Sequence, residues 1–136
     1  MANIYLDSCL IISLIEGDAI QRSLLKKHLV KHVIYSSELA RLETRLLAIR
    51  NQNQDSLQKF DGFFAACQMI DLDRAVFEQA TLLRANSSLK TPDAIHLAAA
   101  IGAGCHEFWT DDKRLKAIAN QFLSVVDWSA LEKMSS

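Results

Sequence analysis

Short runs of strand-forming residues alternate along this chain with longer segments of helical periodicity, and no other feature limits the fold as strongly. The segments expected to form strands are residues 4–6, 33–35, 68–72, 107–110 and 123–126. The helices expected between them are a segment ending near Gly17, residues 19–31, 36–50 and 56–67, a segment capped by Asp73, and residues 93–103 and 113–120. Strands that alternate with helices predict a parallel sheet covered on both faces. We therefore expect an α/β fold, a three-layer sandwich with a central, mostly parallel sheet of four to five strands.

The starts of two of these helices are predicted from residues that suit the free N–H groups of a first turn. The Ser36–Ser37 pair offers a hydroxyl cap for the helix that reaches about residue 50. Thr91 is expected to cap the helix that follows it, with Pro92 at the first helical position, where a missing N–H group has no consequence. That helix is apolar almost all round, so we expect it to be buried.

Composition bounds the class of protein. A chain of 136 residues is expected to form one domain spanning residues 1–136. The formal net charge of −1 gives no global positive field to attract a polyanion, so any such ligand would need a local patch. Three cysteines without C-x-x-C spacing argue against a disulfide framework and a zinc site. With no secretory leader and no apolar run near 18 residues, we expect a soluble, cytoplasmic protein without membrane contact.

Acidic residues occupy the points where a parallel sheet would bind a ligand. In open parallel sheets, ligands bind beyond the carboxyl ends of the strands, near the place where the strand order reverses. Asp7 directly follows the first expected strand, and Asp111 and Asp112 directly follow the fourth. Asp93 opens the apolar helix, and Glu43 lies among leucines on another helix.

Each of these acids also has an ordinary structural explanation. Asp7 and Asp112 suit the N-cap position of the helices that follow them, and Asp93 suits the dipole of its own helix. Glu43 is harder to explain, because an unpaired carboxylate beside an apolar stripe is unfavourable to bury; it would need to reach Arg50 or turn outward. The stripe comprises Leu39, Leu42, Leu46 and Ile49.

The combination of the four acids indicates a metal site. If Asp7, Glu43, Asp93 and Asp112 meet in one cleft, their mutual repulsion raises their pKa values unless a cation is present. Hard oxygen ligands in that number suit Mg²⁺ or Mn²⁺.

Four sequence blocks extend from the N-terminal region to Leu115: "IYLDSCLIISLIEG", "YSSELARLETRL", "TPDAIHLAAA" and "FWTDDKRL". In order and spacing, these blocks resemble the motifs of the PIN domain family, and in particular the VapC-type toxins of bacterial toxin–antitoxin pairs. By this resemblance the metal-site acids are Asp7, Glu43, which stands six residues after Ser37, Asp93, and the last residue of a T-x-D pattern, Asp112.

The resemblance also implies supporting roles for neighbours of the four acids. Ser8 holds the family's usual hydroxyl position beside Asp7, and Thr110 would orient a carboxylate or a water. Asp111 is a departure from the pattern and would either assist as an outer ligand or face solvent. His96 belongs to its block, and we interpret it as a packing residue with a satisfied ring nitrogen.

The function implied by the resemblance is that of a metal-dependent endoribonuclease, in which a water activated by Mg²⁺ or Mn²⁺ hydrolyses RNA phosphodiester bonds. Such a toxin is expected to pair with a cognate antitoxin and to form a homodimer. The candidates for contacting RNA phosphates are Arg41, Arg45, Lys113, Arg114 and Lys116.

Two alternatives from other classes remain open on the sequence. A phosphoacceptor receiver domain is also a small α/β protein with an acidic pair, but its pair follows the first strand and its acceptor ends the third. Here the pair follows the fourth expected strand, and the third ends at Leu72 and Asp73. The other alternative is a non-catalytic PIN-like binding module in which the carboxylates only cap helices.

Overall fold

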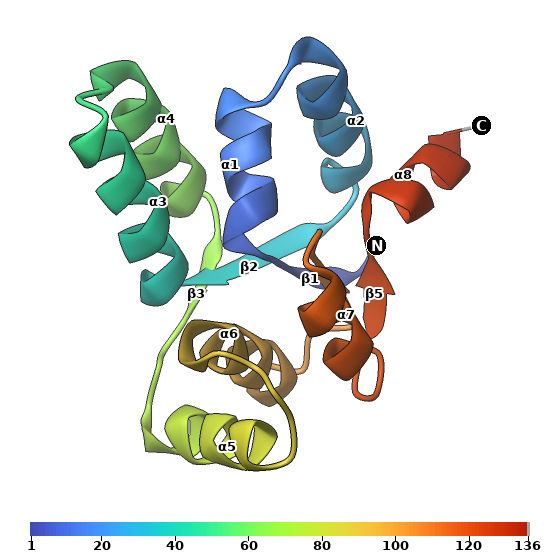
Figure 1. Ribbon diagram of the computed structural model, residues 1–136. Coiled ribbons are helices and arrows are strands. Elements are labelled where there is room, and N and C mark those ends of the chain that lie inside the picture. Colours follow the sequence, from blue (N-terminus) through green and yellow to red (C-terminus); the bar gives the residue numbers. More distant parts are fainter. Residues whose placement is uncertain (136) are drawn as a thin grey trace.

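A computed structural model describes residues 1–135, and its centre is a five-stranded, all-parallel sheet in the order β3-β2-β1-β4-β5 (Figure 1). The strands are β1 (Asn3–Leu6), β2 (Val33–Ser37), β3 (Gln68–Ile70), β4 (Glu107–Trp109) and β5 (Ser124–Val126). The helices are α1 (Ser8–Glu16), α2 (Ala19–Leu29), α3 (Glu38–Arg50), α4 (Gln54–Ala65), α5 (Arg74–Ala85), α6 (Thr91–Gly102), α7 (Lys113–Ala119) and α8 (Trp128–Ser135). The predicted α/β class is confirmed.

The central strand β1 is buried on both faces. Ile4 and Leu6 point into one hydrophobic core, and Tyr5 between them points into the other. In β4, Trp109 joins the core of Ile4 and Leu6, while Phe108 stacks on Tyr5 with ring centroids 5.4 Å apart. Because successive side chains of a strand alternate between faces, a strand with no polar side must be covered by helices on both faces.

Helices cover both faces of the sheet and make three layers (Figure 1). The core that contains Ile4, Leu6 and Trp109 is closed by side chains from α1, α2, α3, α4 and α8. The core that contains Tyr5 and Phe108 is closed by α5, α6 and α7. Helix α6 is buried from Ala94 to Ala100, as its all-round apolar sequence predicts.

The strand order reverses beside β1. From β1 the chain moves outward to β2 and β3, and then returns to the other side of β1 to form β4 and β5. Leu6 pairs with Trp109 in the register of β1 and β4, and the Asp7 N–H donates to the Trp109 carbonyl at 2.9 Å. The residues that follow these two strands, Asp7 and Thr110, therefore lie side by side at the reversal point, where parallel sheets bind ligands.

Two predicted caps are corrected by the structure, and one is confirmed. Strand β2 extends to Ser37, whose hydroxyl makes no cap and instead lies 2.9 Å from the Tyr5 hydroxyl. Helix α6 begins at Thr91 itself, so Lys90 is the N-cap residue and makes no side-chain cap bond. Asp73 caps α5 as predicted, because its carboxylate accepts from the Val76 N–H at 3.1 Å.

Most of the leucine stripe of α3 faces solvent, although Leu39 packs against the core that contains Tyr5. Leu42, Leu46 and Ile49 are 58%, 41% and 55% exposed, while the buried face of α3 is Ala40, Thr44 and Ala48. Those small side chains, four residues apart, let α3 approach α1 and α4 closely. Glu43 therefore sits beside an exposed apolar surface rather than inside a leucine core.

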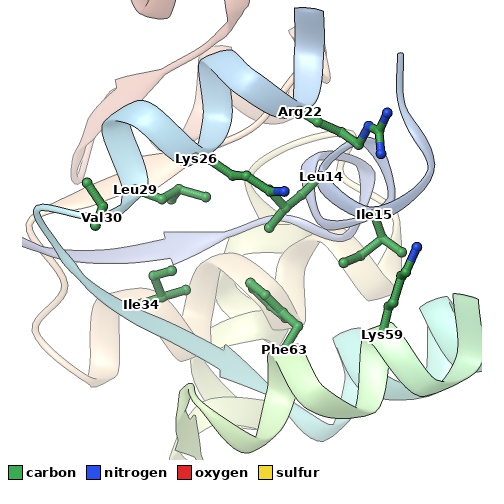
Figure 2. A pocket seen from close by; sticks show the side chains of 9 residues that line it. All are labelled: Leu14, Ile15, Arg22, Lys26, Leu29, Val30, Ile34, Lys59 and Phe63. Carbon is green, nitrogen blue, oxygen red and sulfur yellow. The ribbon is translucent and has the colours of Figure 1, made fainter. Parts of the chain in front are cut away.

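An apolar groove of about 590 Å³ lies between α1, α2, β2 and α4. Figure 2 shows Leu29, Ile34 and Phe63 pointing into it from three of these elements. The remaining lining residues are Leu14, Ile15, Val30, Arg22, Lys26 and Lys59, so the apolar floor has a purely cationic rim. No carboxylate lines this groove.

Helix α8 was not expected from the sequence; it packs through Leu131 on the core that contains Ile4. Among the helices described in residues 1–135, none combines the length and apolar character needed to cross a membrane.

Candidate functional site

The four predicted acids line one hollow of about 360 Å³ at the carboxyl edge of the sheet. They come from four separate parts of the chain: the junction of β1 and α1, the middle of α3, the first turn of α6 and the segment after β4. We call this the acidic hollow; its lining residues are Asp7, Ser8, Cys9, Glu43, Asp93, His96, Asp111 and Asp112.

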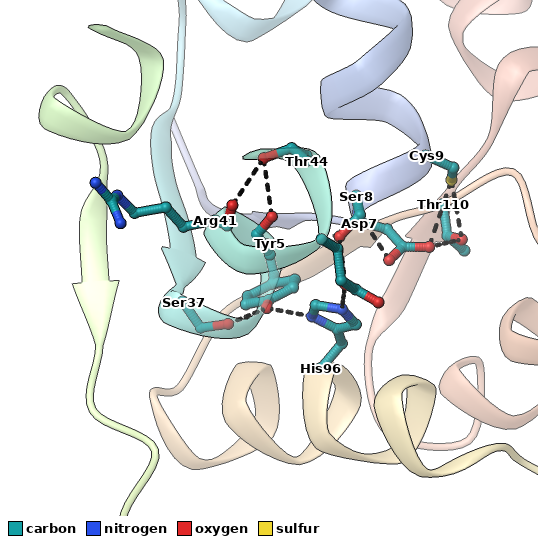
Figure 3. Close-up of polar contacts among 11 residues, drawn as sticks. Tyr5, Asp7, Ser8, Cys9, Ser37, Arg41, Thr44, His96 and Thr110 are labelled. Carbon is teal, nitrogen blue, oxygen red and sulfur yellow. Dashed lines mark hydrogen bonds and ion pairs between the residues drawn. The ribbon is translucent and has the colours of Figure 1, made fainter. Parts of the chain in front are cut away.

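Asp7 is buried, and both of its carboxylate oxygens are held. Its Oδ1 accepts from the Ser8 backbone N–H at 2.9 Å, which makes Asp7 the N-cap of α1. Its Oδ2 accepts from the Thr110 hydroxyl at 2.8 Å (Figure 3). Asp7 thus caps a helix and lines the hollow at the same time, so the two interpretations offered by the sequence are compatible.

Glu43 is anchored by two neighbours through a single oxygen. The Ser8 hydroxyl donates to Oε1 at 2.7 Å, and His96 Nε2 lies 2.6 Å from the same atom. Oε2 makes no hydrogen bond with any residue in the described part of the chain. The partners of Glu43 are therefore Ser8 and His96, rather than Arg50, which the sequence had offered.

From Glu43, a chain of hydrogen bonds continues into the core through His96, Tyr5 and Ser37, which are labelled in Figure 3. His96 Nδ1 lies 2.6 Å from the Tyr5 hydroxyl, which lies 2.9 Å from the Ser37 hydroxyl. Burial raises the pKa of Tyr5 far above its usual value, so its hydroxyl keeps its proton. With a carboxylate at one end, the Nε2 of His96 carries a hydrogen and donates it to Glu43. His96 is thus buried with both ring nitrogens satisfied, as expected, but one of them holds a candidate site residue.

The carboxylates of the acidic hollow influence one another's protonation. Burial raises the pKa of Asp93, and the negative charges of Asp7 and Asp112 raise it further. Burial alone would also raise the pKa of Glu43, but the hydrogen bond and charge of His96 and the hydroxyl of Ser8 outweigh it and lower that pKa. Glu43 is therefore kept ionised, while the anionic form of Asp93 is disfavoured.

Thr110 connects the two strand ends. Its Oγ1 donates to Asp7 and also accepts from the Asp112 N–H at 3.1 Å. Asp112 caps α7, since its Oδ1 accepts from the Leu115 N–H at 2.9 Å. Asp111 and Asp112 are both exposed and both line the hollow, but only Asp112 is among the charges that raise the pKa of Asp93.

The donor chemistry of the acidic hollow fits Mg²⁺ or Mn²⁺. Its acids offer only oxygen ligands, which these ions prefer, and the raised pKa of Asp93 marks a place where a cation would relieve repulsion. In the described residues 1–135, however, no three His, Cys, Asp or Glu side chains are arranged as a metal-ready cluster. The fit is one of donor type and placement.

Cys9 also lines the hollow, although no sequence motif indicates a role for it. Its Sγ lies 3.4 Å from Asp7 Oδ2. Burial, followed by the charge of Asp7, raises the pKa of the Cys9 thiol to about 12. Because the thiolate is the nucleophilic form, this thiol is a poor nucleophile at neutral pH.

The candidate phosphate-contacting cations divide into two groups. Arg41 and Arg45 form ion pairs with Asp61, and Figure 3 shows Arg41 pointing away from the carboxylates. Lys116 lies 2.6 Å from Asp127. Lys113 and Arg114 instead line a second hollow of about 350 Å³, which we call the basic hollow; its lining residues are Lys90, Asp93, Asp112, Lys113 and Arg114.

Comparison with known proteins identifies the family. The PIN domain profile matches residues 4–121, so the chain belongs to the PIN domain family, whose members are typically nucleases that use divalent metals. No significant match was found among curated proteins.

Structural neighbours include toxins and toxin–antitoxin complexes. VapBC2 from Rickettsia felis, crystallised with a promoter DNA fragment, is 17% identical with a TM-score of 0.74, covering 93% of this chain and 98% of its own. A toxin–antitoxin complex from Klebsiella pneumoniae is 23% identical with a TM-score of 0.71, covering 90% and 95%. VapC20 from Mycobacterium tuberculosis, a sarcin-ricin loop cleaving toxin, is 18% identical with a TM-score of 0.70, covering 84% and 93%. At these identities the likeness is one of fold.

Proposed function

We propose that this protein is a Mg²⁺- or Mn²⁺-dependent endoribonuclease and the toxin of a type II toxin–antitoxin pair. The observation that carries the proposal is the meeting of Asp7, Glu43, Asp93 and Asp112 in one hollow at the strand-reversal point of a PIN domain. Structural neighbours that are VapC-type toxins give it further support. RNA hydrolysis in the cytoplasm is the activity that follows.

In this proposal Asp7, Asp93 and Asp112 hold the metal, and Glu43 is either a ligand or the acceptor of the proton lost by the attacking water. When bound, the metal supplies a lowered pKa for that water and neutralises charge on the leaving oxygen. Ionised Glu43 is available for either role because His96 and Ser8 lower its pKa. Asp111 assists from the rim or faces solvent.

The side chains around the acids fix their positions. Thr110 holds Asp7 and the backbone of Asp112, so it sets the spacing of the two strand ends. Ser8 and His96 both bind Oε1 of Glu43, which leaves Oε2 to face the reacting groups. Fixed carboxylates lower the reorganisation needed when a substrate binds.

Two protein partners belong to the proposal. The first is a cognate antitoxin, as in the VapBC2 and Klebsiella pneumoniae complexes. The apolar groove with its rim of Arg22, Lys26 and Lys59 suits an amphipathic antitoxin helix that carries acidic residues. The second partner is another copy of this chain, for which the exposed stripe of α3 is the contact surface.

The receiver alternative gains no support. The acid that directly follows β3 is Asp71, at the end of an edge strand of the sheet, and Asp73 further along caps α5. Neither of these acids lines the acidic hollow.

The function is tested with purified protein and a labelled single-stranded RNA. We expect internal cleavage with Mg²⁺ or Mn²⁺, none with EDTA, and none by Asp93→Asn with either metal. Cleavage by Asp93→Asn at the wild-type rate would refute the assignment. If the wild type bound neither metal in calorimetry at neutral pH, the non-catalytic module would be the better description.

A further inference from the structure

We propose that the basic hollow is a phosphate subsite that holds the RNA phosphate next to the one being cleaved. This inference rests on the proposed ribonuclease function and assigns a role to Lys90, which no sequence motif singled out. The ligand chemistry is a phosphodiester of single-stranded RNA.

The position of the basic hollow relative to the acids is the first support. Asp93 and Asp112 line both hollows, so the two share a wall. A phosphate at the metal-binding acids would therefore have a neighbouring phosphate of the same strand within reach of the cations. The three cations outnumber the two carboxylates of the basic hollow, which gives this side a local positive charge in a chain whose net charge is −1.

The freedom of these cations is the second support. Lys90, Lys113 and Arg114 make no side-chain hydrogen bond or ion pair with any residue of the described chain. Arg41, Arg45 and Lys116, by contrast, are occupied by Asp61 and Asp127. Unpaired cations beside a hollow are available to a phosphate, and the guanidinium of Arg114 can bind two phosphate oxygens at once.

The fixed backbone of Lys90 is the third support. Arg84 Nε donates to the Leu89 carbonyl, and Arg84 Nη1 donates to the Thr91 hydroxyl, each at 2.9 Å. The side chain of Leu89 is buried in the core with Tyr5. The residues on either side of Lys90 are thus tied to α5 and to the core. The base of the Lys90 side chain is therefore positioned before a ligand arrives, although its amine remains free.

The first test measures RNA binding in EDTA, where metal-dependent cleavage cannot proceed. Lys90→Ala, Lys113→Ala and Arg114→Ala are compared with Lys31→Ala, which loses the same charge. Lys31 stands just before β2, at the amino-terminal ends of the strands, whereas the hollows lie at the carboxyl ends. For a labelled single-stranded RNA, each hollow variant should reduce the slope of log Kobs against log salt concentration by about 0.7, the value for one lost phosphate contact. Lys31→Ala should keep the wild-type slope. Hollow variants with the slope of Lys31→Ala would overturn the subsite.

The second test asks which phosphate is bound. RNAs that carry a single neutral methylphosphonate linkage on one or the other side of the cleavage site are assayed with Mg²⁺. For one of the two, the wild type and Lys31→Ala should lose about tenfold in kcat/KM, which is about 1.4 kcal/mol. Lys90→Ala should show little further loss of kcat/KM on that RNA, because this variant already lacks the contact to the phosphate. Fully additive losses would overturn the proposal, as would a wild type insensitive to both linkages.

A third arm uses inorganic phosphate as the probe. Suppose that phosphate binding depends on Lys90 but that Lys90→Ala binds and cleaves RNA as the wild type does. That result would assign the hollow to a free anion and overturn the RNA subsite.

The outcomes separate this proposal from the function on which it rests. If the wild type cleaves RNA and Asp93→Asn does not, while the three hollow variants match Lys31→Ala, only the subsite fails. If the wild type neither binds nor cleaves RNA, the proposed function fails and the subsite fails with it.

Discussion

His96 Nε2 lies 2.6 Å from Glu43 Oε1, and the other nitrogen of the same ring lies 2.6 Å from the buried hydroxyl of Tyr5. The candidate site is thereby joined to the core of the sheet through one histidine, which is only 1% exposed. A glutamate on α3 is held by a residue of α6 and by the first residue of α1. The geometry of the acidic hollow consequently depends on the packing of three helices.

Replacing His96 should weaken metal binding through Glu43. In His96→Leu, Glu43 remains partly buried but loses its main hydrogen-bond donor, so its pKa should rise and Mg²⁺ binding should require a higher pH. We also expect a loss of ~1–3 kcal/mol in the free energy of unfolding from the broken buried network. Calorimetric Mg²⁺ titrations at several pH values measure the first effect, and urea denaturation measures the second.

Tyr5→Phe is the matched control for His96→Leu. It removes the hydroxyl beside His96 Nδ1 but leaves the contact between His96 and Glu43. It should lose stability in the same range while keeping the wild-type pH dependence of Mg²⁺ binding. Equal metal affinities in the two variants at every pH would mean that His96 serves stability alone.

The doubled acid after β4 can be resolved by two single substitutions. Replacing a residue that only supports a metal ligand typically costs about 10–100-fold in activity. Asp112→Asn should lower RNA cleavage by more than that, whereas Asp111→Asn should change it by less than about tenfold. The fold should survive in both, because asparagine is as good an N-cap as aspartate at the start of α7. Initial cleavage rates and circular dichroism spectra provide the comparison, and the reverse order of the two rates would assign the ligand to Asp111.

The repulsion around Asp93 should appear as a pH-dependent stability. The pKa of Asp93 is raised in the folded protein, so the folded state holds a proton that the unfolded state releases. Without metal, this group therefore destabilises the fold as pH rises from the ordinary aspartate pKa through the raised one. Asp93→Asn should melt at a higher temperature than the wild type at neutral pH in EDTA, and the difference should vanish at acidic pH.

Mg²⁺ should reverse that order. At about 100 times its Kd, a ligand that binds only the folded state adds ~2.7 kcal/mol to its stability, and this gain should be small in Asp93→Asn. Thermal melts with and without Mg²⁺ measure both effects. A wild type whose melting temperature ignores Mg²⁺ would argue against any metal role for Asp93.

Local sequence signals predicted the sheet and the positions of the acids well, because both depend on residues close together in the chain. Short apolar runs marked the strands, with Asp7 directly after β1 and Asp112 in the short segment between β4 and α7. The strand order that brings these two strand ends together is a tertiary property, and local sequence signals do not contain it. The partners of Glu43 were missed for the same reason, since His96 lies 53 residues away and on a different helix.

Helix α3 shows why periodicity alone does not identify the packed face of a helix. Its buried side consists of Ala40, Thr44 and Ala48, whose hydrophobic signal is weaker than that of the leucines facing solvent. Close helix packing favours small residues, so the strongest apolar stripe was not the packed one. Lys90 was not a candidate residue on the sequence, because a lysine before a helix gives no functional signal until its neighbours in space are known.

The exposed stripe of α3 provides the last prediction, a homodimer formed through this helix. A glutamate placed among Leu42, Leu46 and Ile49 would have to be desolvated in such an interface, so Leu46→Glu should raise the dimer Kd at least tenfold, or about 1.4 kcal/mol. The monomer itself should stay folded, because Leu46 is already 41% exposed. Ile20→Glu, at a site 79% exposed on α2, is the control and should leave the dimer unchanged. Sedimentation velocity over a range of concentrations measures both. Because Leu46 follows Glu43 by one helical turn, a dimer built on this stripe would bring the acidic hollow close to the subunit boundary; a wild type that is monomeric at every concentration would contradict it.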